Sequence, residues 1–80
     1  MEKVKISTEY ITLGQFLKLM DIVETGGEVK DFLMENKIIV NEKICNERGK
    51  KIYPGDILEI NYIDETEDKV SLSIKVEKEV

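Results

Sequence analysis

The sequence predicts an α+β fold in which two short helices pack at a corner against a small, mostly antiparallel sheet, with strands added at both termini. Two threonines each begin a pattern typical of a helix N-terminus, and apolar residues at helical spacing follow both of them. Two segments that alternate between apolar and polar residues, 3–7 and 70–77, flank this region and can pair in one sheet. A chain of 80 residues is enough for one domain.

The first helix is expected to begin at Leu13. Thr12 and Gln15 have the spacing of a capping box, in which each side chain accepts a hydrogen bond from the backbone amide of the other residue. Apolar residues then recur at i, i+3, i+4 and i+7, which leaves Gly14, Lys18 and Asp21 on the other face of the helix.

The second helix is expected to run from Thr25, which repeats the capping spacing, to about Asn36. Two interpretations stand for Gly26 and Gly27. As first-turn residues they leave backbone amides uncovered at the positive end of the helix dipole, where a phosphate oxygen can bind. Alternatively, they only end the first helix and permit close packing.

Turn residues divide the second half of the chain into strands. Residues 38–40 are apolar and β-branched, and Asn41-Glu42 after them predicts a two-residue hairpin, although Glu42 is a poor residue for such a turn. Pro54-Gly55 predicts a turn with Gly at its third position, followed by a strand over 57–62. The alternating residues 70–76 predict a last strand.

Composition excludes several kinds of chemistry. The chain has one cysteine, Cys45, and no histidine, so it lacks both an internal disulfide and a structural zinc site. No Ser/His/Asp set, Walker loop or HExxH is present, and the carboxylates at 64–68 lack the ligand order of a calcium loop. We therefore expect no catalysis, no cofactor and no metal.

Charge and hydropathy indicate where the protein works. No apolar run is long enough to span a membrane, and the N-terminus lacks the apolar core of a signal peptide, so a cytoplasmic protein is expected. High lysine and isoleucine content is typical of an AT-rich bacterial genome. The net charge is −5, and the four acidic residues at 64–68 supply most of it. An anionic partner is thus still compatible with a local basic patch.

Residues 12–60 resemble the RNA-binding domain first described in the small-subunit ribosomal protein S-four, also called the alpha-L motif. The similarity rests on Leu-x-x-Phe-Leu in the first helix, on Val40-Asn41 and on Gly55-Asp56, in that order. The combination looks like the small stand-alone YaaA/YbcJ-type branch of that family. It implies one domain over residues 1–80, with the RNA-binding motif at 11–62 and an acidic loop plus C-terminal strand at 63–80.

The resemblance also implies which residues contact RNA. Family members grip structured RNA through its backbone, and the matching positions in this chain are Lys18, Gly26, Gly27, Lys30, Asn41, Arg48, Gly49, Lys50 and Lys51. The chain departs from the family pattern in three places. The basic residue of the second helix is delayed to Lys30, Glu42 stands where many members carry Gly, and Asn36 replaces a glycine before the hairpin.

The segment Arg48-Gly49-Lys50-Lys51 is the densest group of cations in the chain. Arg48 can form two parallel hydrogen bonds with a phosphate, whereas a lysine acts as a mobile point charge. The alternative interpretation is a solvated basic turn. The three tyrosines are not spaced as a base-stacking platform, and only Tyr53, next to the basic turn, is a candidate for RNA contact.

These observations predict a non-catalytic protein that binds structured RNA, either ribosomal or transfer RNA, through phosphate contacts. The alternative is a β-grasp protein-interaction module without nucleic-acid binding, which shares the Val-Asn hairpin and the Gly-Asp before its last strand. A sheet crossed by one long helix, in place of two helices at a corner, would favour that alternative.

Overall fold

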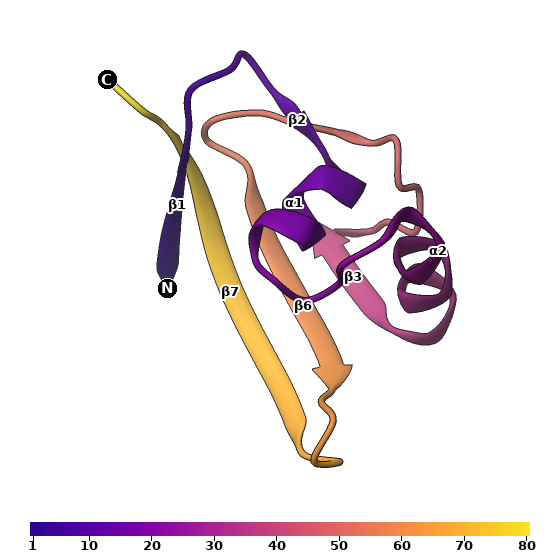
Figure 1. The fold of residues 1–80 in the computed structure, drawn as a ribbon. Helices are drawn as coiled ribbons and strands as arrows, with labels where there is room; N and C mark the ends of the chain where they lie inside the picture. Colours follow the sequence, from indigo (N-terminus) through magenta and orange to yellow (C-terminus); the bar gives the residue numbers. More distant parts are fainter.

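A computed structural model describes residues 1–80, in which two helices lie on one face of a five-stranded sheet (Figure 1). The strand order is β1-β7-β6-β3-β4, and every pair is antiparallel except β1 and β7. A separate pair, β2 with β5, is antiparallel. The elements are β1 (Glu2–Ile6), β2 (Ile11–Thr12), α1 (Leu13–Leu19), α2 (Gly26–Glu35), β3 (Lys37–Val40), β4 (Lys43–Ile44), β5 (Lys51–Ile52), β6 (Ile57–Ile63) and β7 (Lys69–Lys78).

Both helices begin where their capping residues predict. At α1 the capping box is complete, because the Gln15 amide donates to Thr12 Oγ1 over 3.2 Å and the Thr12 amide donates to Gln15 Oε1 over 2.9 Å. At α2 only half of the box forms. Thr25 Oγ1 accepts from the Glu28 amide over 3.2 Å, but the Glu28 carboxylate accepts from the Glu24 amide instead.

The core lies between the helices and the sheet and consists of 14 buried apolar residues. The predicted stripe of α1 contributes Leu13, Phe16 and Leu17, each 0% exposed. Along β6, Leu58 and Ile60 are buried while Ile57 and Glu59 are exposed, so the sheet packs on one face only. This architecture confirms the predicted fold class, and its two separate helices do not favour the β-grasp alternative.

The expected hairpin connects β3 and β4, and its two central residues, Asn41 and Glu42, have positive φ values of 50° and 71°. Such values match the type I′ turn of two-residue hairpins. The second predicted turn also forms, with Gly55 at φ 98° and a hydrogen bond of 3.0 Å from the Asp56 amide to the Tyr53 carbonyl.

Replacing Glu42 by glycine is expected to raise the free energy of unfolding by up to about 1 kcal/mol. A side chain at positive φ costs roughly 1–2 kcal/mol, and the larger conformational entropy of glycine in the unfolded chain offsets part of that gain. Urea denaturation followed by circular dichroism measures the change. The control is Glu47→Gly, the same replacement at an exposed residue without positive φ. Equal effects of the two changes would contradict the strain assigned to Glu42.

The strands β6 and β7 extend together beyond the helices and end in the acidic turn, defined here as residues 64–68 (Figure 1). The Thr66 hydroxyl and the Asp68 backbone amide both donate to Asp64 Oδ1, over 2.7 Å and 3.0 Å. These hydrogen bonds hold the pKa of Asp64 below its usual value.

No helix of this protein has the length and hydropathy that crossing a membrane requires.

Candidate nucleic-acid interface

A groove of about 310 Å³ lies where α1, the first turn of α2 and the loop between β4 and β5 meet. Four of the residues expected to contact RNA line it, although they come from three separate segments: Lys18, Gly26, Arg48 and Gly49. The rest of the lining is Thr12, Gly14, Gln15 and Val29. We call this feature the cationic groove.

We call residues 48–51 the basic turn. Its backbone is fixed to the start of α1 by the first amides of the helix. The Leu13 amide donates to the Lys50 carbonyl over 2.8 Å, and the Gly14 amide donates to the Arg48 carbonyl over 2.9 Å. Helix starts leave such amides without intrahelical partners, so the loop supplies acceptors that the helix needs. Arg48 is therefore carried on an anchored backbone.

Gly14 makes this close approach feasible. It is buried, and a Cβ at this position would lie 3.4 Å from the Arg48 carbonyl oxygen and 3.4 Å from Val29 Cγ1. Gly14 shares the groove with Lys18, on the face opposite the apolar stripe as predicted, but it is buried there because the loop between β4 and β5 packs on this part of α1. No sequence signal except the missing side chain itself pointed to this contact.

Gly26 and Gly27 form the first turn of α2, so the interpretation that they end the first helix is wrong. Their amides have no acceptor within the protein, whereas the Glu28 and Val29 amides are both bonded to Thr25. A Cβ on Gly26 would have no neighbour within 4 Å, so the close-packing interpretation is also wrong. The positive end of α2 thus meets the cationic groove at Gly26, whose amide is free to donate.

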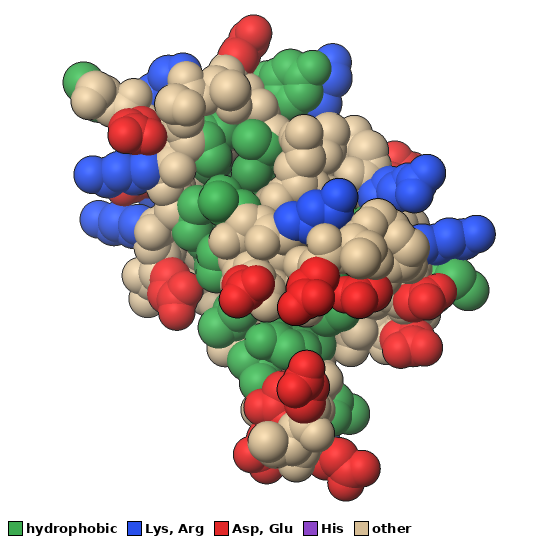
Figure 2. Space-filling model, in the orientation of Figure 1, with side chains coloured by type: hydrophobic (Ala, Val, Ile, Leu, Met, Phe, Trp, Pro, Cys, Tyr) green, Lys and Arg blue, Asp and Glu red, His purple; other side chains and the backbone are tan.

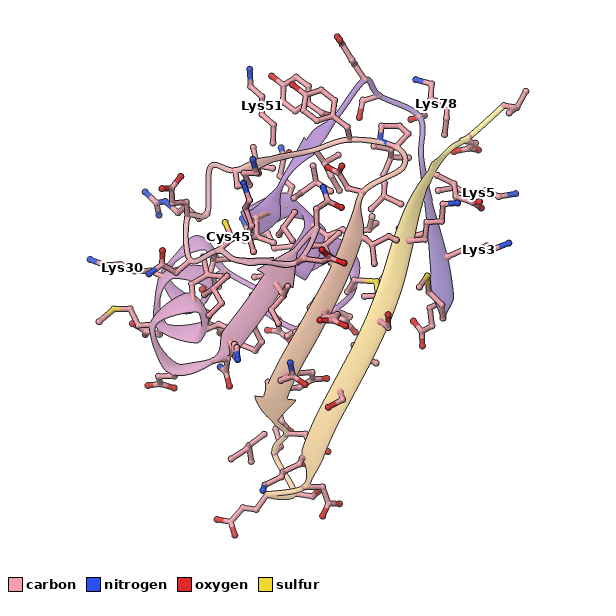
Figure 3. All side chains as sticks on the ribbon, turned by 180° about the vertical axis from the view of Figure 1, so that it is seen from behind. Lys3, Lys5, Lys30, Cys45, Lys51 and Lys78 are labelled. Atoms are coloured by element: carbon pink, nitrogen blue, oxygen red, sulfur yellow. The ribbon has the colours of Figure 1, made fainter.

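The cations of the basic turn point to different surroundings. Arg48 lines the cationic groove, while Lys50 lines a neighbouring hollow of about 240 Å³ together with Lys43. Lys51 does not line the groove, and its ammonium lies over the ring of Tyr10, 4.9 Å from the ring centroid. Lys30 is exposed on α2, at the edge of the molecule opposite β1 (Figure 3).

Asn41 is also exposed, but intramolecular hydrogen bonds engage its side chain. Its Nδ2 donates to Asp56 Oδ1 over 2.9 Å, and its Oδ1 accepts from the Ile57 amide over 2.9 Å. The other carboxylate oxygen of Asp56 accepts from the Tyr53 amide over 2.8 Å. The Val-Asn and Gly-Asp signatures thus meet in one network that joins the hairpin to the Pro54-Gly55 turn.

The tyrosines form a pairing that their spacing did not predict. Tyr10 precedes β2 and Tyr53 follows β5, and their ring centroids are 5.5 Å apart at an interplanar angle of 46°. Tyr62 pairs elsewhere, with Phe32 at 5.5 Å. The sequence would have indicated the Tyr10–Tyr53 pair only if the register of β2 against β5 had been known.

Basic side chains form local groups on the surface in spite of the net charge of −5. Figure 2 shows Lys and Arg side chains on the upper half of one face, a row of Asp and Glu beneath them, and further acidic groups around the end of the β6–β7 hairpin. An anion approaching this face therefore meets cations only as local groups, and it meets negative charge at the row of carboxylates and at the acidic turn.

The two helices at a corner and the β3–β4 hairpin give the arrangement that the resemblance to the S4 class of RNA-binding domain implied. The sequence model of the S4 domain family matches residues 4–67, and the chain belongs to this family. It is similar to the probable ribosome maturation protein RlbA of Bacillus subtilis (strain 168), with 53% identity over 57 residues, which are 71% of this chain and 80% of that relative. No solved structure matched the chain.

Proposed function

We propose that this protein is a non-catalytic RNA-binding protein that holds structured RNA by its phosphates in the cationic groove. The observation that carries the proposal is the convergence of Lys18, Arg48 and the free amide of Gly26 on one groove. The motif over residues 11–62 supplies these groups, and residues 63–80 support it with the acidic turn and the last strand.

The groove offers complementary donors to a phosphate group. The Arg48 guanidinium can donate two parallel hydrogen bonds to phosphate oxygens, and the Gly26 and Gly27 amides can donate further ones along the axis of α2. Lys18 adds a charge on the α1 side. Paired RNA presents phosphates and 2′-hydroxyls, with few readable base edges, and a small set of fixed donors suits that surface.

The remaining cations extend the contact beyond the groove. Lys30 and Lys50 flank it on the α2 side and on the loop side, where they can neutralise neighbouring phosphates. In this proposal Asn41 acts by positioning the hairpin, since its side chain is engaged with Asp56 and Ile57. The acidic turn keeps RNA away from the far end of the molecule and so orients it.

Ribosomal RNA is the RNA that we propose first, with transfer RNA second. The support is the similarity to a probable ribosome maturation protein, which covers 71% of this chain. A protein with this role works on ribosomal particles in the bacterial cytoplasm. Neither the groove nor the loop contains a nucleophile with an adjacent base, so binding without catalysis is the activity that these residues support.

Binding to ribosomal RNA fragments and to transfer RNA across a salt series tests this proposal. If about three to five phosphates are contacted, the logarithm of affinity falls with the logarithm of salt concentration at a slope of roughly −2 to −4.5. The double variant Arg48→Ala, Lys50→Ala is expected to flatten that slope by roughly 1 to 2.

The matched control is Lys3→Ala, Lys5→Ala, which removes two positive charges from β1, away from the groove (Figure 3). It is expected to leave the slope nearly unchanged. Salt-independent binding, or no binding of the wild-type protein to either RNA at low salt, would overturn the proposal and direct the search to protein partners.

A further inference from the structure

We infer that Tyr10 and Tyr53 stack an unpaired nucleobase of the RNA that the cationic groove holds. The preferred ligand is then a paired stem interrupted by an unpaired nucleotide, and not a continuous duplex. The inference rests on the proposed function and adds to it a second contact of different chemistry, aromatic where the groove is ionic.

The small β2–β5 sheet brings the two tyrosines together. Ile11 pairs with Ile52 in an antiparallel register, so the residues just outside this pair, Tyr10 and Tyr53, face each other. Tyr53 is 41% exposed, while Ile52 beside it is fully buried. Ile52 therefore supplies the packing of this segment, and the exposed ring beside it is available to a ligand.

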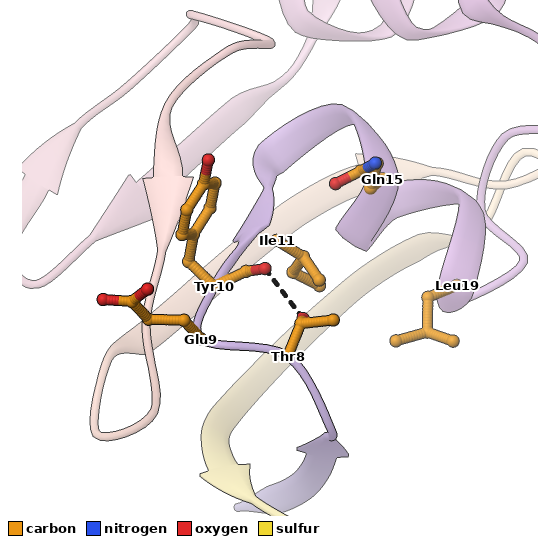
Figure 4. A pocket seen from close by; sticks show the side chains of 6 residues that line it. All are labelled: Thr8, Glu9, Tyr10, Ile11, Gln15 and Leu19. Atoms are coloured by element: carbon orange, nitrogen blue, oxygen red, sulfur yellow. Dashed lines mark hydrogen bonds between the residues drawn. The ribbon is translucent and has the colours of Figure 1, made fainter.

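Both tyrosines are held on a fixed backbone. The Thr8 hydroxyl donates to the Tyr10 carbonyl over 2.8 Å (Figure 4), and the Tyr53 amide donates to Asp56 Oδ2 over 2.8 Å. Asp56 is in turn bonded to Asn41. A ring whose backbone is already ordered stacks on a base at a smaller entropic cost than a ring on a free loop.

The aromatic pair lies within reach of the groove. Arg48 and Tyr53 are five residues apart, which spans at most about 18 Å, or roughly the rise of five stacked nucleotides. Lys51 stands between them in the sequence, with its ammonium 4.9 Å from the Tyr10 ring centroid. Because Lys51 lies over Tyr10, a base that stacks on the exposed ring of Tyr53 finds a cation for its phosphate close by.

Tyr10 also borders a hollow of about 530 Å³ (Figure 4). Ile11 and Leu19 give it an apolar side, and Leu19 is 57% exposed. A volume of this size is in the range that holds small organic ligands, so a nucleotide displaced from its stem has room beside the pair.

The test compares two RNA hairpins with the same stem, one fully paired and one carrying a single bulged 2-aminopurine. Wild-type protein is expected to bind the bulged hairpin roughly 5- to 100-fold more tightly and to quench the 2-aminopurine fluorescence on binding. Tyr53→Leu is expected to abolish both the preference and the quenching. Tyr53→Phe, which keeps the ring, is expected to retain both.

The outcomes separate this inference from the proposed function. If wild-type protein binds both hairpins equally, with the expected salt slope and sensitivity to Arg48→Ala, the groove binds RNA but the aromatic contact does not exist. If Tyr53→Leu keeps the preference for the bulge, the inference is likewise overturned. If wild-type protein binds neither hairpin, both proposals fail. Thermal unfolding of each variant confirms that the protein compared is folded.

Discussion

Reversing two charges in the cationic groove, with Lys18→Glu and Arg48→Glu, is expected to weaken RNA binding on the order of 100-fold near 0.1 M salt. Each phosphate neutralised by a cation contributes roughly 0.9 to the salt slope, or nearly tenfold in affinity at this salt concentration relative to 1 M. Loss of two such contacts therefore accounts for about 60-fold, and repulsion by the new carboxylates adds to it. Filter binding or fluorescence anisotropy measures the change.

The control for this variant must carry the same total charge. Lys3→Glu with Lys75→Glu, two residues paired across β1 and β7, also changes the net charge from −5 to −9, because each substitution changes it by −2. Since these lysines lie on the sheet, away from the groove, the expected loss is less than about fivefold. An equal loss in both variants would show that net charge, and not the groove, governs binding.

The largest effect on folding is expected from Phe16→Ala, which should lower the free energy of unfolding by roughly 3–5 kcal/mol. Phe16 projects from α1 into the core and is 0% exposed, so its removal loses buried apolar surface and leaves a cavity. A domain of 80 residues has a total stability of roughly 4–12 kcal/mol. The loss is therefore about a quarter or more of the total stability, and the variant should unfold at a clearly lower temperature than the wild-type protein.

Phe32→Ala is the matched control for this prediction. Phe32 lies on α2, is only partly buried and packs against Tyr62, so a smaller loss is expected. Urea denaturation of both variants, followed by circular dichroism, makes the comparison. A loss below about 1 kcal/mol for Phe16→Ala would contradict the packing of α1 against the sheet, because burial of a whole phenyl ring contributes more than that.

The sequence by itself determined the local elements of this protein. Capping at Thr12 and Thr25, the positive-φ turn at Asn41-Glu42 and the Pro54-Gly55 turn all depend on contacts among residues two to four positions apart. Alternation along 70–76 likewise predicted β7, since one face of the sheet meets the core and the other meets solvent. The resemblance to the alpha-L motif then indicated which residues contact RNA, and those assignments stay predictions.

Only the tertiary structure decided how those elements meet. The carbonyls of Arg48 and Lys50 reach the first amides of α1 across more than thirty residues, which makes Gly14 a buried contact and collects Lys18, Gly26 and Arg48 in one groove. The same loop carries Lys51 away from that groove to Tyr10. Periodicity indicates which face of an element is apolar, but not which distant segment covers that face. The covering segment is decided by the whole fold, because 14 apolar side chains must be buried together and the first amides of α1 must find acceptors.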